Sequence, residues 1–110
     1  MKLDDIENAL AYYERFAKAG GLTSQEIVAI RRCLGHVRDA MKKSKLEVAS
    51  QDEAVTAMRS MAKTNGGQYS KKSCDDRFKK AGELIHRWRL LMPQVPMPWA
   101  PGASEMGKAP

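Results

Sequence analysis

The fold is decided by residues 22–41, which read LTSQEIVAIRRCLGHVRDAM. Thr23 and Glu26 have the spacing of a capping box, in which each side chain bonds the backbone N–H of the other residue. Apolar residues then recur every three or four positions, which predicts one buried helical face. We expect a helix over about residues 24–44, with Gly35 on the far side of the apolar stripe. The stripe consists of Ile27, Ile30, Leu34, Val37 and Met41.

Three further segments show the same helical period, at about residues 4–19, 51–64 and 73–92. Each begins with side chains that accept hydrogen bonds from the free N–H groups of a first helical turn. Glycine pairs end the first and second of these segments, and Pro93 ends the third. The predicted capping residues are Asp4 or Asp5, Ser50 together with Glu53, and Ser73.

Alternation of apolar and polar residues, the mark of a strand, is absent from the sequence. We therefore predict an all-α protein, a small bundle of four helices that forms a single domain over residues 1–92. The core should include Ile30, Leu34, Ile85 and Trp88, which lie mid-helix on apolar stripes. Residues 93–110 hold all five prolines, which predicts an extended proline-rich tail. We expect Trp99 to fold back onto the bundle or to contact a partner, with disorder from residue 102 onward.

Composition places the chain among small cytoplasmic domains. It has 110 residues, of which 43% are hydrophobic, too many for a fully disordered chain. No apolar run approaches the roughly 18 residues that a membrane span needs. The first five residues contain acids where a secretory signal would carry bases, so we expect neither export nor a membrane partner.

Two cysteines, Cys33 and Cys74, are too few for a disulfide scaffold, and we expect both to be reduced and to act as small hydrophobic residues. With His36 and His86 they form a two-Cys, two-His set. Zinc ligands usually come in close pairs, whereas Cys74 and His86 are far apart along one helix. We therefore predict no metal site and place both histidines at helix surfaces.

Groups of residues that would support catalysis are not found. The glycine pairs lack the lysine and hydroxyl residues of a phosphate-binding loop, and no nucleophile elbow occurs. The adjacent carboxylates fall at helix starts, where the helix dipole already favours acids. We expect no enzymatic activity and no cofactor.

Positive charge is concentrated in two parts of the chain. The net charge is +6, from 19 lysines and arginines against 13 acids, and most of it falls in residues 31–45 and 59–89. At 100° per residue, four bases of the second helix lie within about a sixth of a turn of one another. This basic stripe consists of Arg31, Arg38, Lys42 and Lys45. Four lysines near the start of the last helix oppose its dipole: Lys71, Lys72, Lys79 and Lys80.

Residues 22–35 resemble the opening helix of repressor-type helix-turn-helix regulators. In that family a short turn follows, and a second helix then begins with Ser-Gln. Here residues 36–39, which read HVRD, continue the helical pattern. The sequence departs from the family where the motif requires a turn, so we do not assign the chain to it.

Two functional hypotheses follow. The first is a small, basic, non-enzymatic regulatory or accessory protein that binds nucleic acid or a nucleoprotein complex through the basic stripe and the four lysines. The second is a protein-binding adaptor or inhibitor, acting alone or as a dimer. Its contacts would come from Met58 and Met61 on the third helix, or from Trp99 in the tail.

Overall fold

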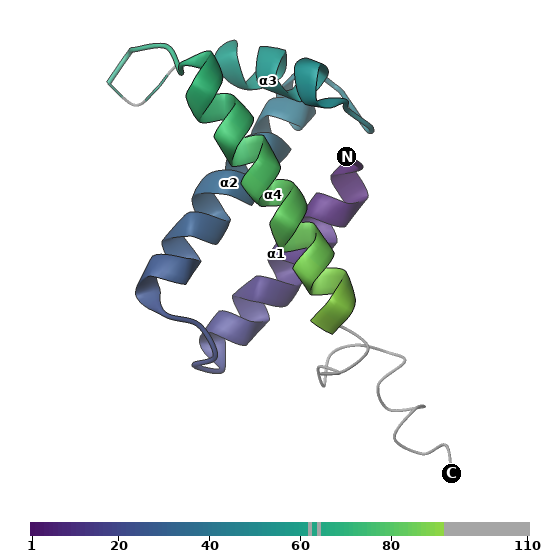
Figure 1. Ribbon diagram of the computed structural model, residues 1–110, viewed down its shortest axis with the longest axis vertical. Helices are drawn as coiled ribbons and strands as arrows, with labels where there is room; N and C mark the ends of the chain where they lie inside the picture. The colour runs from purple at the N-terminus through teal and green to yellow at the C-terminus, as the bar shows by residue number, and fades with distance from the viewer. Residues whose placement is uncertain (62, 64, 92–110) are drawn as a thin grey trace.

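The computed structural model describes residues 1–61, 63 and 65–91, and within them the chain forms four α-helices and no strand (Figure 1). The predicted all-α bundle of four helices is confirmed. The helices are α1 (Leu3–Lys18), α2 (Ser24–Lys43), α3 (Gln51–Arg59) and α4 (Lys71–Leu91). The predicted tail, including Trp99, lies outside the described residues.

Helices α2 and α4 form the centre of the bundle. Each packs against all three other helices, whereas α1 and α3 make no contact with each other in the described part of the chain. Figure 1 shows α4 crossing in front of α2, with α3 across one end of this pair. A site built on α2 and α4 therefore rests on the two most extensively packed helices.

The start of α2 confirms the predicted capping box. The Thr23 hydroxyl accepts from the Glu26 N–H at 3.1 Å, and the Glu26 carboxylate accepts from the Thr23 N–H at 3.0 Å. Ser50 and Glu53 form the second predicted capping box at the start of α3. From its start, α2 continues without interruption to Lys43. The turn that a helix-turn-helix motif would need at residues 36–39 is therefore replaced by helix.

Two helices end with the same hydrogen-bonded turn. After α1, Gly20 has φ +80° and its N–H donates to the Ala17 carbonyl, as in a Schellman motif. After α2, Lys45 takes the equivalent position with φ +58°, and its N–H donates to the Lys42 carbonyl. A lysine in this left-handed conformation is strained where glycine is not. Lys45, predicted at the end of the basic stripe, thus lies beyond the helix.

The start of α1 differs from the prediction. The helix begins at Leu3, and Lys2 stands at the capping position without a side-chain cap. The Leu3 N–H instead donates to the Glu47 carbonyl at 2.8 Å, beside an antiparallel bridge between Lys2 and Val48. Asp4 and Asp5 therefore lie inside the first turn, because backbone from the α2–α3 connection replaces the expected side-chain cap.

Helix α3 is shorter than predicted. It ends at Arg59, whereas the sequence pattern predicted helix to residue 64. The Ser60 hydroxyl donates to the Ala57 carbonyl at 2.6 Å and the Met61 N–H donates to the Met58 carbonyl. These bonds satisfy the last carbonyl groups of the helix and tighten the chain into a turn.

Helix α4 starts earlier than predicted, at Lys71. Its first turn is capped by Ser70, whose hydroxyl accepts from the Ser73 N–H at 3.1 Å. Ser73, the predicted cap, is therefore the third residue of the helix. Asp75 contacts Lys71 at 3.1 Å, so it serves as an ion-pair partner one turn further on.

The core joins all four helices. Ile30, Leu34, Ile85 and Trp88 are buried as predicted, whereas Ile27 is half-buried. The Tyr13 hydroxyl donates to the Leu84 carbonyl at 2.6 Å and so connects α1 with α4, and burial raises the pKa of Tyr13 to about 12. The remaining fully buried large side chains include Ile6, Tyr12, Val37, Met41 and Met58.

Both cysteines are free, as predicted, and both are buried. Cys33 lies on α2 and Cys74 lies on α4. Burial raises the pKa of each thiol above its ordinary value, so both remain protonated at neutral pH. They fill core space between the two central helices.

Candidate functional site

Two surface clefts border α2 and share Arg31, Gly35 and Arg38. The α1-side cleft, about 510 Å³, lies between α2 and α1 and is completed by Glu7, Leu10, Ala11 and Glu14. The α4-side cleft, about 430 Å³, lies on the other side of α2. It is completed by Arg32, His36, Asp39, Met61, Tyr69 and Arg77.

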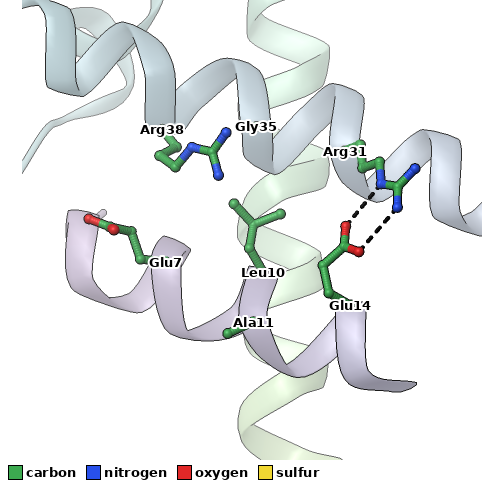
Figure 2. A pocket seen from close by; sticks show the side chains of 7 residues that line it. All are labelled: Glu7, Leu10, Ala11, Glu14, Arg31, Gly35 and Arg38. Carbon is green, nitrogen blue, oxygen red and sulfur yellow. Dashed lines mark hydrogen bonds and ion pairs between the residues drawn. The ribbon is translucent and has the colours of Figure 1, made fainter. Parts of the chain in front are cut away.

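The charges of the α1-side cleft are balanced and fixed by ion pairs between α1 and α2. The Arg31 guanidinium donates twice to the Glu14 carboxylate, at 2.9 and 3.1 Å, in the fork geometry that Figure 2 shows. This hydrogen bonding holds the pKa of Glu14 below its ordinary value. Just outside the cleft, Lys42 lies 3.5 Å from Glu7. These pairs hold two antiparallel helices in register.

The α4-side cleft has an excess of positive charge. Four arginines line it, and Asp39 is the single carboxylate among its lining residues. Asp39 accepts from the Arg38 Nε at 3.0 Å. Arg31 is paired with Glu14, and Arg38 is paired with Asp39, so the excess charge of this lining comes from Arg32 and Arg77, a net charge of +2 with a neutral histidine. An anion is therefore attracted to the α4 side of α2.

Arg77 of α4 is held at the wall of this cleft without a carboxylate partner among the described residues. Its Nη1 lies 2.8 Å from His36 Nδ1, and its guanidinium carbon lies 5.0 Å from the centre of the Tyr69 ring. The rings of His36 and Tyr69 are 4.3 Å apart. A neutral acceptor and an aromatic face therefore position a half-buried cation whose charge is not neutralised.

His36 is buried, which corrects the prediction that both histidines lie at helix surfaces. Only 8% of it is exposed, because Tyr69 and Arg77 cover it. Since Arg77 donates, Nδ1 must accept, and the proton of the neutral ring is on Nε2. Burial lowers the pKa of His36 below its ordinary value, and the charge of Arg77 lowers it further.

The structure divides the predicted basic stripe. Arg31 and Arg38 line both clefts, whereas Lys42 and Lys45 line neither. The four lysines of α4 do not line the α4-side cleft either. Lys71 pairs with Asp75 at 3.1 Å and Lys80 pairs with Glu83 at 3.7 Å, while Lys72 and Lys79 are exposed on the same helix.

The residues of the adaptor hypothesis are also separated. Met58 is 0% exposed and belongs to the core, so it is not a surface contact in this structure. Small neighbours on α3 and the close approach of α2 and α4 enclose it. Met61 is half-buried and lines the α4-side cleft, and Trp99 lies outside the described residues.

The site residues predicted from the sequence did not include Arg32, Tyr69 and Arg77. Arg32 stands three residues before Gly35, and residues three or four apart are neighbours on a helix surface. Helical spacing alone therefore places Arg32 on the same part of the α2 surface as Gly35. Tyr69 and Arg77 come from the connection to α4 and from α4 itself. Only the packing of α4 on α2 brings them to the cleft.

Among the residues that the structure describes, no group of three or more His, Cys, Asp and Glu side chains is placed to hold a metal ion. None of the described helices combines the length and the apolar character needed to cross a membrane. No family model matches the chain, and neither a curated protein nor a solved structure was found to match it.

Proposed function

We propose that this protein is a small, non-enzymatic, basic helical protein that binds nucleic acid, and that the α4-side cleft contacts the phosphate backbone. The proposal rests on the position and the charge of Arg77. Its charge is held at the cleft wall by His36 and Tyr69 and is not neutralised by a described carboxylate. Ordering this long side chain in advance lowers the entropy cost of binding an anion.

The chemistry of the cleft suits phosphate. A guanidinium presents five N–H donors in a planar fork that matches the oxygens of a phosphate group. Arg31 and Arg38 each use part of this fork on a carboxylate, at 2.9–3.1 Å, and their remaining donors can reach a ligand. The carboxylates thus orient these two guanidiniums and leave some of their N–H donors available to a ligand. Arg32 adds a fourth positive charge to the lining.

The distribution of charge supports a polymer of phosphates over a single small anion. Positive charge continues beyond the cleft lining, where Lys80 stands one helical turn after Arg77 on α4 and the Lys63 ammonium lies 5.5 Å from the centre of the Tyr69 ring. A phosphate chain that leaves the cleft would meet further cations, which strengthens non-specific attraction. The α1 side of α2 offers no comparable attraction, because its acids and bases are paired.

The adaptor hypothesis is the second candidate, and fewer of its predicted contact residues are exposed than the sequence suggested. Met58 is in the core, so this hypothesis now rests on Met61 at the cleft and on Trp99. The two candidate functions can be distinguished by measuring which residues change their signals when nucleic acid is added.

The test is a titration of the ¹⁵N-labelled protein with a short DNA duplex at low salt, followed by nuclear magnetic resonance. The proposal predicts that the backbone signals of His36, Tyr69 and Arg77 shift, while those of Glu7 and Ala11 in the α1-side cleft do not. No spectral change at low salt would refute nucleic-acid binding. Shifts confined to the α1-side cleft would place the interface on the wrong side of α2.

A further inference from the structure

Gly35 lies in the middle of α2, where glycine is the least favourable residue after proline. A Cβ atom at this position would meet no heavy atom within 4 Å. Packing among the described residues therefore does not require glycine here. The position also has no left-handed backbone, since the positive-φ glycines described are Gly20 and Gly66. Gly35 is buried, and it forms part of the floor that both clefts share.

Charged side chains surround this floor. The helical neighbours of Gly35, three and four residues away in each direction, are Arg31, Arg32, Arg38 and Asp39. All four line the α4-side cleft together with Gly35. Gly35 is buried among these neighbours, and a longer side chain at position 35 would project into the space that they line.

A second glycine inside a helix shows that the absence of a side chain does not by itself mark a position in the cleft. Gly82 lies inside α4, and a Cβ atom there would make an ordinary contact with Met1 at 3.8 Å. Gly82 lines neither of the two clefts. What distinguishes Gly35 is its place on the floor of the positively charged cleft.

Resting on the proposed function, we propose that Gly35 is the point where the phosphate backbone of the nucleic acid approaches α2 most closely. Glycine allows a phosphate group to approach the helix surface, within reach of the donors of Arg31 and Arg38 that their carboxylate partners leave unused. A side chain at position 35 would hold the phosphate away from these donors. Glycine at this position therefore favours binding over helix stability.

The test compares Gly35→Ala, Gly35→Leu and the matched control Gly82→Ala with the wild type. Thermal unfolding measures stability, and fluorescence anisotropy with a labelled DNA duplex at fixed low salt measures affinity. Both alanine variants should raise the unfolding midpoint by about 4–8 °C, because each replaces a helical glycine. Gly35→Leu should weaken binding by about tenfold, the loss of one charge-assisted contact, and Gly35→Ala by less. Gly82→Ala should bind as the wild type does.

The outcomes separate this inference from the function on which it rests. If the folded Gly35→Leu variant binds as tightly as the wild type while Arg77→Gln binds more weakly, the role of Gly35 is wrong and the proposed function stands. If the wild type itself does not bind the duplex, the proposed function fails and this inference fails with it. Equal weakening by Gly82→Ala and Gly35→Ala would also overturn the inference, since it would trace the effect to helix rigidity.

Discussion

Arg77 Nη1 and His36 Nδ1 lie 2.8 Å apart, although 41 residues separate them in the sequence. The contact joins the two central helices and requires a neutral imidazole, because Nδ1 must accept the hydrogen bond. The same contact orients a cation whose charge no described carboxylate neutralises. The stability of the fold and the geometry of the candidate interface thus depend on the same hydrogen bond.

Protonation of His36 should destabilise the protein. Its pKa is lowered below the ordinary value of 6.5 by burial and by Arg77, with the Asp39 carboxylate acting in the opposite direction. The unfolded chain therefore binds the proton more readily than the folded one, and stability falls as pH drops below about 6.5 and through the folded-state pKa. Urea unfolding at pH values from 7.5 to 5.5 should show this decline.

Two variants serve as controls for that decline. His36→Gln removes the titrating group and should flatten the pH dependence in this range, while its amide oxygen can still accept from Arg77. His86→Gln changes the exposed histidine of α4 and should keep the wild-type decline. An unaltered decline in His36→Gln would assign the effect to another group.

Leu34 tests the core. Its side chain is fully buried at the centre of α2, so Leu34→Ala should lower the free energy of unfolding by about 2–5 kcal/mol. Chemical denaturation monitored by circular dichroism measures this loss. As a surface comparison, Val28→Ala changes an exposed residue of the same helix and should have a much smaller effect. A loss well under 1 kcal/mol for Leu34→Ala would contradict the assigned core.

Lys45 offers a stabilising substitution. It holds φ +58° after α2, a conformation that costs an L-residue roughly 1–2 kcal/mol and glycine little. Lys45→Gly should therefore stabilise the fold. The gain should reach at most about 1 kcal/mol, because the greater entropy of glycine in the unfolded chain offsets part of the relieved strain. Lys45→Gln, which removes the charge and keeps the strain, separates the two effects in the same denaturation experiment. Equal stability of both variants would show that strain is not the cause.

The helices could be predicted from the sequence where the signals are local. The Thr23–Glu26 capping box and the stripe through Leu34 placed α2 correctly, because both depend on residues within one or two turns. The start of α1 was missed because its partner is distant in the sequence. The Leu3 N–H bonds the Glu47 carbonyl, and no pattern near residue 3 indicates this.

The candidate site was predictable only in part. Arg31 and Arg38 were expected on one face, and both line the clefts. Helical periodicity could not show that Glu14 pairs with Arg31 or that Lys45 lies past the end of α2. His36 was predicted at the surface. It is buried because Arg77 reaches its ring from another helix, and the sequence around His36 does not indicate this contact.

The central claim is that phosphate contacts come from the α4-side cleft, and the salt dependence of duplex binding tests it most directly. Each contact contributes about −0.9 to the slope of log affinity against log salt concentration. Arg32→Gln/Arg77→Gln should weaken binding and flatten this slope by about two units. Lys42→Gln/Lys45→Gln removes the same charge outside the cleft and should leave the slope nearly unchanged. A cleft variant that keeps the wild-type slope, or a control that flattens it equally, would contradict the account.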